Sequence, residues 1–248
     1  MPSMSENEYS KAAVRGEPSY VWRAGQIRRL EMIRSAMPAD RKPSVLVNGC
    51  GVGTYLANLA TFSDPAVGLD IDFERTVDSR QKSEYVINGA GETLPFADNL
   101  YDLILSNEVI EHVQDDRLAV QEMVRCLKPG GRIVLFCPNR GYPFETHGLY
   151  WKGKYHFGNK LFINYLPNVW RNKLAPHVRV YTRRDLEKLF AGLPVKYIKR
   201  STIFGGYDNI IARSPKLGKT IRGFLYALEK TFLNVFGLSH FWIIEKVN

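Results

Sequence analysis

Residues Val45–Thr54 read VLVNGCGVGT, a short apolar run that leads directly into three glycines at alternate positions. The apolar run predicts a buried strand, and the glycines predict a tight turn before a helix. Glycine at Gly49 and Gly51 allows backbone angles that a side chain would forbid, and lets a ligand approach the main chain. The helix start behind the turn offers free N–H groups to a polar or anionic ligand.

A second apolar run, Ala66–Asp70, ends in an acid about 20 residues after the glycines, a spacing at which a carboxylate can bind the hydroxyls of a ribose. The glycines alone are also compatible with a turn that has no ligand. Together, the two runs predict a nucleoside-binding α/β domain.

The length of 248 residues and the hydrophobic content of 45% suit one α/β domain with a full core. The first residues carry no signal-peptide pattern and no run is long enough to span a membrane, so we expect a cytoplasmic protein. Cys50, Cys126 and Cys137 lack metal-ligand spacing, so we expect reduced thiols and no metal site.

The charge is unevenly distributed along the chain. The formal net charge is +9, and residues 151–248 contain 18 Lys and Arg residues against 5 Asp and Glu residues. A basic C-terminal part favours contact with an anionic membrane or a nucleic acid, although a solvated basic face without a partner fits equally well.

Apolar runs and helical periodicities alternate along the chain, which predicts a parallel sheet covered on both faces. The expected strands are Ser44–Asn48, Ala66–Asp70, Glu84–Asn88, Tyr101–Ser106, Arg132–Cys137, Val195–Ile203 and Phe241–Val247. The expected helices are Ser19–Met37, Tyr55–Phe62, Phe73–Gln81, Arg117–Leu127 and Thr182–Phe190, with Thr182 as N-cap of the last.

Three segments depart from this alternation. Residues 1–17 are expected to form a flexible arm before a single domain at 18–248. Residues 138–178 are rich in aromatics and glycine, and we interpret them as an inserted cap or substrate loop with short helices. Residues 215–238 are expected to form an amphipathic helix, which packs as an ordinary surface helix, lies on a membrane or forms a dimer contact.

Five collinear segments resemble the motifs of class I S-adenosylmethionine-dependent methyltransferases. They are Val45–Gly53, Asp70, Gly89–Phe96 with Tyr101 and Asp102, Ser106–Val113 and Leu127–Gly131. The resemblance implies a Rossmann-like, mostly parallel seven-stranded sheet with helices on both faces. It also implies S-adenosylmethionine as cofactor and a small-molecule, glycan or lipid-linked acceptor, methylated at oxygen. Nucleic acid is not expected as acceptor, because Ser-Asn-Glu-Val stands where base-methylating members carry Asn/Asp-Pro-Pro-aromatic.

The resemblance also implies a set of cofactor contacts: Gly49, Cys50, Gly51, Gly53, Asp70, Ile71, Gly91, Glu92 and Asn107. Val47 and Ala90 depart from the pattern, since the family often carries acids at both positions. Asn48 is expected to point to the face opposite Val47, and is therefore not an obvious replacement.

Transfer to oxygen usually needs a general base. His147, in an aromatic-rich loop, and His112, after the fourth strand, are the expected catalytic residues, although either histidine could be purely structural.

Other functions remain open. The fold could serve a non-catalytic protein that binds a membrane or partner through its basic C-terminal part. RNA modification is a further alternative, and the basic C-terminal part is the only feature that supports it. A nicotinamide-dependent oxidoreductase is disfavoured, because Thr54 replaces the third fingerprint glycine. Tyr150 and Lys154 have the spacing of the catalytic Tyr-x-x-x-Lys pair of such enzymes. That pair needs a helix to bring both side chains to one face, and Gly148 and Gly153 disfavour a helix there.

Overall fold

The computed structural model describes residues 23–248, so the arm expected at residues 1–17 lies outside the described residues. Seven strands form one sheet in the order β10-β11-β5-β4-β1-β2-β3. β11 runs antiparallel to β5 and β10, and the remaining neighbours are parallel. The predicted Rossmann-like, mostly parallel seven-stranded sheet is confirmed.

The strands follow the apolar runs of the sequence closely. They are β1 Val45–Asn48, β2 Ala66–Asp70, β3 Val86–Asn88, β4 Tyr101–Asn107, β5 Leu127–Pro138, β10 Val195–Ile203 and β11 Ser239–Lys246. The first strand is buried along its whole length, as expected of a strand in the centre of a covered parallel sheet. β5 begins earlier than predicted, because Leu127 already pairs with Tyr101 of β4. The register then shifts, and regular pairing resumes at Leu103 and Arg132.

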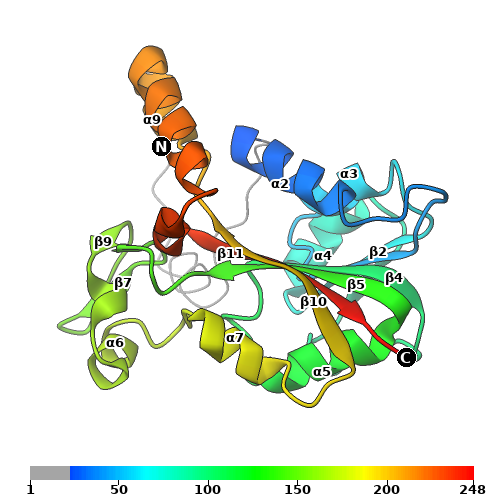
Figure 1. Ribbon diagram of the computed structural model, residues 1–248. Coiled ribbons are helices and arrows are strands. Elements are labelled where there is room, and N and C mark those ends of the chain that lie inside the picture. The colour runs from blue at the N-terminus through cyan, green and yellow to red at the C-terminus, as the bar shows by residue number, and fades with distance from the viewer. Residues whose placement is uncertain (1–22) are drawn as a thin grey trace.

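Helices cover both faces of the sheet (Figure 1). α2 (Ala24–Arg34) and α3 (Thr54–Leu59) lie on one face, while α5 (Asp116–Cys126) and α7 (Arg183–Leu189) lie on the other. α4 (Phe73–Arg80) contacts β2 and β3. The N-cap predicted at Thr182 is present, with Thr182 Oγ1 accepting from the Asp185 N–H, and the Asp185 side chain completes a capping box.

Two apolar cores lie on opposite faces of the sheet, because successive side chains of a strand point to opposite sides. Leu46 packs into the core that contains α5 and α7, whereas Val45 and Val47 pack into the core that contains α2 and α3. Both cores consist of fully buried aliphatic and aromatic side chains, which fixes the strand register.

The insertion at 138–178 contains more strand than expected. Besides η1 (Ile163–Tyr165) and α6 (Asn168–Leu174), it forms the pairs β6 (Phe144–Glu145) with β9 (Lys160–Leu161) and β7 (Leu149–Trp151) with β8 (Lys154–His156). Tyr150 and Lys154 lie on different strands of the second pair, so they do not share the helix face that an oxidoreductase pair requires.

The amphipathic helix expected at 215–238 is divided in two. α9 (Pro215–Leu228) follows the short α8 (Asp208–Arg213) and projects away from the sheet (Figure 1), and η2 (Phe232–Phe236) follows it. The break occurs at Thr231, whose extended backbone ends the helix and whose hydroxyl accepts from the Leu233 N–H. Within residues 23–248, the helices are too short or too polar to cross a membrane.

Asp102 at the start of β4 provides a test of the fold. Its buried carboxylate accepts hydrogen bonds from the Ser44 N–H and hydroxyl and from Arg41 and Lys128. Asp102→Asn should lower the free energy of unfolding by about 1.5–3 kcal/mol, because it removes a charged acceptor from four donors. Urea denaturation measures the change, with Asp98→Asn, which weakens only an exposed ion pair with Arg125, as the control that should cost less than about 1 kcal/mol.

The contribution of Asp102 to the free energy of unfolding should depend on pH. Hydrogen bonds from Arg41 and Ser44 lower the pKa of Asp102 in the folded protein despite its burial. Its contribution is therefore full above the unfolded-state pKa of about 3.9 and is lost as the pH falls further. A difference between wild type and Asp102→Asn that stays constant down to the acid transition would contradict this account.

Candidate functional site

A cavity of about 1090 Å³ opens at the carboxyl ends of β1, β2 and β4. Its walls include the glycine turn after β1, the ends of β2 and β4, part of α2 and two segments of the insertion. The segments after β3 and β10 and Tyr226 of α9 complete them. This position is where open parallel sheets bind ligands, since the loops after successive strands meet there. The sequence-predicted residues that line it are Gly49, Cys50, Gly51, Asp70, Ile71, Gly91, Glu92, Asn107, His112 and His147.

The glycine turn exposes its main chain to this cavity. Gly49 has a φ of +74°, and a Cβ there would approach Val109 Cγ2 to 2.3 Å, so neither the backbone angle nor the space allows a side chain. Gly51 has a φ of +54°, and a Cβ there would meet no atom within 4 Å because it faces open space. Gly53 lies outside the cavity wall. It is the N-cap residue of α3, and it packs on Ser79 of α4.

Asp70 connects the two strands that begin the site. Its Oδ2 accepts from the Gly51 N–H at 2.7 Å, and its Oδ1 accepts from the Asp72 N–H at 2.9 Å. Each carboxylate oxygen can accept a further hydrogen bond, so Asp70 can hold the glycine turn and still bind a ribose hydroxyl. The side chain is 7% exposed, and that exposure is toward the cavity.

Asn48 and Val47 lie on opposite faces of β1. As expected, the two side chains point to opposite faces, but it is Asn48 that lines the cavity, whereas Val47 is buried in the core beside α3. The Asn48 carboxamide is 1% exposed and has no hydrogen-bond partner among the described residues. An unpaired buried amide is costly, so a polar ligand group fits here. Asn48 therefore lies on the face of the sheet that meets the cavity, and Val47 does not.

These features fit the binding of S-adenosylmethionine. The glycine turn leaves space for the backbone to approach a ligand, Asp70 offers an acceptor for ribose hydroxyls, and Asn48 offers both a donor and an acceptor. Ala90 also lines the cavity and adds no polar contact, as predicted.

Arg29 of α2 fixes the segment that follows β4. Its guanidinium donates to Asn107 Oδ1 at 2.6 Å and to Glu108 Oε1 at 2.8 Å. Ser239 donates a further hydrogen bond to Glu108 Oε1. Burial opposes ionisation of Glu108, but the charge of Arg29 outweighs it and lowers the pKa of that carboxyl. Glu108 is therefore held as a carboxylate by α2 and β11.

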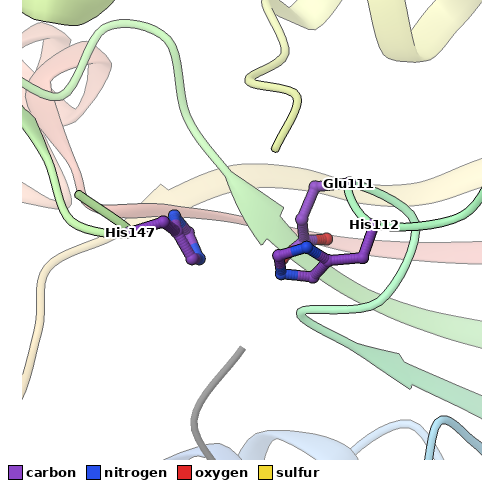
Figure 2. A group of neighbouring side chains, drawn as sticks. All are labelled: Glu111, His112 and His147. Carbon is purple, nitrogen blue, oxygen red and sulfur yellow. The ribbon is translucent and has the colours of Figure 1, made fainter. Parts of the chain in front are cut away.

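Glu111, His112 and His147 meet beside this segment (Figure 2). Their ligand-type atoms all lie within 4.8 Å of one another, and the His112 and His147 ring centroids are 5.4 Å apart. Burial, and then the charge of Glu108, raises the pKa of Glu111 well above its usual value. Burial and the neighbouring His147 lower the pKa of His112 to about 4, so His112 is neutral at pH 7.

A buried ion pair holds His147 in place. Glu145 Oε1 lies 3.1 Å from His147 Nδ1, and Glu145 Oε2 accepts from Arg171 at 2.8 Å. Burial opposes ionisation of Glu145, but its contacts with His147 and the charge of Arg171 lower its pKa to about 2. The insertion thus holds His147 at the cavity wall through Glu145 and Arg171.

Several of these residues were not identified from the sequence. Glu111 directly precedes His112, and Glu145 stands two residues before His147. This proximity to the predicted histidines was a usable signal. Arg29 and Arg171 carry no signal, because an arginine on a helix is usually a solvated side chain. Glu92, predicted as a cofactor contact, lines the cavity and also accepts from the Gln114 N–H at 2.7 Å.

Comparison with known proteins agrees with this geometry. Residues 46–135 match a family described as "Methyltransferase domain". The chain is 32% identical over 98 residues to demethylmenaquinone methyltransferase of Corynebacterium efficiens, which covers 39% of this chain and 43% of that protein. It is 28% identical over 109 residues to malonyl-[acyl-carrier protein] O-methyltransferase of Buchnera aphidicola. This match covers 43% of this chain and 44% of that protein.

The chain thus spans less than half the length of these curated relatives. Among solved structures, an S-adenosylmethionine-dependent methyltransferase from Mesorhizobium loti matches with a TM-score of 0.60 and 14% identity. The match covers 87% of this chain and 96% of that one. At this identity the likeness concerns the fold alone.

The buried ion pair allows a test of how the insertion is held. Arg171→Met should lower the free energy of unfolding by about 3–5 kcal/mol, because it leaves the buried Glu145 charge unpaired. Arg183→Met, which removes an exposed ion pair with Glu187, is the control and should cost less than about 1 kcal/mol. Equal losses in both variants would contradict the role assigned to the buried pair.

Proposed function

We propose, from the premise that the chain belongs to the class I S-adenosylmethionine-dependent methyltransferases, that it methylates a small-molecule, glycan or lipid-linked acceptor at oxygen. The observation that carries this proposal is that one cavity combines the edge expected to bind a nucleoside with a pair of histidines.

One part of the cavity would bind the methyl donor. Gly49 and Gly51 leave space at the main chain, Asp70 would accept from the ribose hydroxyls, and Asn48 and Asn107 add amide groups. When bound, S-adenosylmethionine supplies a methyl group on a positively charged sulfur. Methyl transfer depends mainly on holding the nucleophile in line with that group, so positioning is the chief task of these residues.

The other part of the cavity would bind the acceptor. Tyr155 and Phe157 add aromatic surface from the insertion, and His112 and His147 stand next to them. The low pKa of His112 leaves its imidazole neutral at pH 7, the form that can take a proton from an acceptor hydroxyl. His147, held by Glu145, would orient the same hydroxyl.

The relatives support this class of acceptor. One is named for demethylmenaquinone and the other for an O-methyl transfer to a malonyl group on a carrier protein. A small or carrier-linked acceptor also agrees with a cavity of about 1090 Å³, which is large enough for a nucleoside donor and a modest second ligand.

The assignment of Asp70 predicts how the protein binds the methyl donor. Asp70→Ala should weaken binding of S-adenosylmethionine by about 1.5–3 kcal/mol, because charge-assisted hydrogen bonds to the ribose are lost. Equilibrium dialysis measures the affinity, and Asp40→Ala, an exposed acid outside the cavity, is the matched control. Equal affinities of wild type and Asp70→Ala would contradict the assignment of Asp70.

A second prediction separates the competing reactions. Incubation with methyl-labelled S-adenosylmethionine and fractionated lipid, glycan and metabolite pools should label one pool and release the demethylated cofactor. Labelling that is lost in His112→Gln, with donor binding intact, supports the base role of His112. Binding of a nicotinamide nucleotide in place of S-adenosylmethionine would instead favour an oxidoreductase.

We propose further that the protein is cytoplasmic and contacts anionic membrane through α9 and η2. Large apolar side chains are exposed there, with Phe224 at 63% and Phe232 at 84% relative exposure. Lys216, Lys219 and Lys230 lie on the same segment. A projecting element with aromatic and basic side chains suits an interface with negatively charged headgroups.

Liposome sedimentation tests the membrane contact. More protein should pellet with anionic than with neutral vesicles, and Phe224→Ser with Phe232→Ser should reduce that fraction severalfold, since burial of both rings is lost. Leu118→Ser, an exposed apolar residue on α5, is the control. Equal sedimentation with neutral and anionic vesicles would remove the membrane from this account.

A further inference from the structure

Glu111, His112 and His147 lie together with a geometry that neither methyl-donor binding nor proton transfer requires (Figure 2). Their ligand-type atoms all lie within 4.8 Å of one another. A metal ion about 2.1 Å from each ligand would separate the ligand atoms by about 3–4 Å, so the side chains would have to approach one another by up to about 1 Å to close on an ion. The cluster joins the segment after β4 to the insertion, 35 positions along the chain.

Glu111 is the group that most needs a partner. The residue is 1% exposed, and neither carboxylate oxygen has a hydrogen-bond donor among the described residues. The neighbouring Glu108 is itself a carboxylate, so it can only accept a hydrogen bond from a protonated Glu111. Arg29 is already engaged by Asn107 and Glu108, and Arg171 is engaged by Glu145. A buried carboxyl without a donor is unfavourable, and a cation between it and the histidines would satisfy it.

Both histidines are oriented as metal ligands usually are. His112 Nδ1 lies 3.2 Å from the His177 carbonyl oxygen, which can only accept, so Nδ1 carries the hydrogen and Nε2 keeps its lone pair. His147 Nδ1 faces the ionised Glu145 carboxylate in the same way, which again leaves Nε2 free. A carbonyl or carboxylate behind the imidazole is the arrangement that supports metal-binding histidines.

From this geometry we infer that Glu111, His112 and His147 form a binding site for a divalent transition-metal ion such as Zn²⁺ or Mn²⁺. Two imidazoles and one carboxylate favour these ions over Mg²⁺ and Ca²⁺, which prefer oxygen ligands.

The site would keep an open position toward the cavity, because His112 and His147 line the cavity wall while Glu111 is buried behind them. Three protein ligands with an open position are typical of catalytic rather than structural metal sites. An acceptor hydroxyl bound there would lose its proton more readily. With the metal bound, His112 Nε2 would be a ligand, so His112 would act through the metal and would take the proton directly only in the metal-free protein. This last role rests on the proposed methyl transfer, whereas metal binding itself does not.

Metal titration without donor or acceptor tests the inference. The protein is stripped with a chelator and titrated with Co²⁺, followed by visible absorption, and with Zn²⁺ and Mg²⁺ by calorimetry. The wild type should bind one equivalent of Co²⁺ and Zn²⁺, and Mg²⁺ more weakly. His112→Gln, His147→Gln and Glu111→Gln should each weaken Zn²⁺ binding at least about tenfold, since even loss of a supporting partner costs about 10–100-fold.

His156→Gln is the matched control, because His156 is exposed on β8 outside the cluster. Its affinity for Zn²⁺ should equal that of the wild type. Wild-type protein that shows no saturable Zn²⁺ binding, or variants that bind as the wild type does, would overturn the site. If S-adenosylmethionine fails to bind while the metal result stands, the proposed function falls and the metal site remains.

A second measurement needs no variant and guards against misfolding. Diethylpyrocarbonate modifies accessible histidines, and mass spectrometry locates the label. Zn²⁺ should protect His112 and His147 and leave His156 equally labelled. Equal labelling of all three histidines with and without Zn²⁺ would contradict the assignment.

Discussion

The hydrogen bond from the Gly51 N–H to Asp70 is the contact on which the site depends. It joins the turn after β1 to the end of β2, so two loops from neighbouring parallel strands face one cavity. The turn can reach Asp70 only because its glycines adopt positive φ angles, with Gly49 pressed against Val109. The sheet supplies rigidity, and this contact converts its carboxyl edge into a binding surface.

Charged pairs complete the cavity from outside the sheet. Arg29 connects α2 to the segment after β4, and the pair of Glu145 and Arg171 anchors the insertion that presents His147. Both pairs are partly or fully buried, where removal of one partner costs more than the pair itself contributes. The part of the cavity wall that carries His147 therefore depends on the insertion staying folded, whereas the part formed by Asn107 and Glu108 depends on the sheet and on α2.

The sequence predicted the sheet well, because apolar periodicity and turn residues are local signals. β2 and β10 match their predicted limits, and the N-cap at Thr182 is present. Prediction failed where the outcome depends on contacts distant in the chain. Thr231 ends the helix expected to run to residue 238, and the insertion pairs its strands instead of forming only helices. Arg29 and Arg171 gave no signal, since only the fold reveals which carboxylates they meet.

The most direct measurement is a crystal structure with S-adenosylhomocysteine, the demethylated form of the donor. The account predicts density for the nucleoside in the cavity, with ribose hydroxyls on Asp70, the main chain of Gly49 and Gly51 alongside, and the sulfur directed toward His112 and His147. Density elsewhere on the molecule, or an empty cavity at a concentration that saturates the protein in solution, would contradict it.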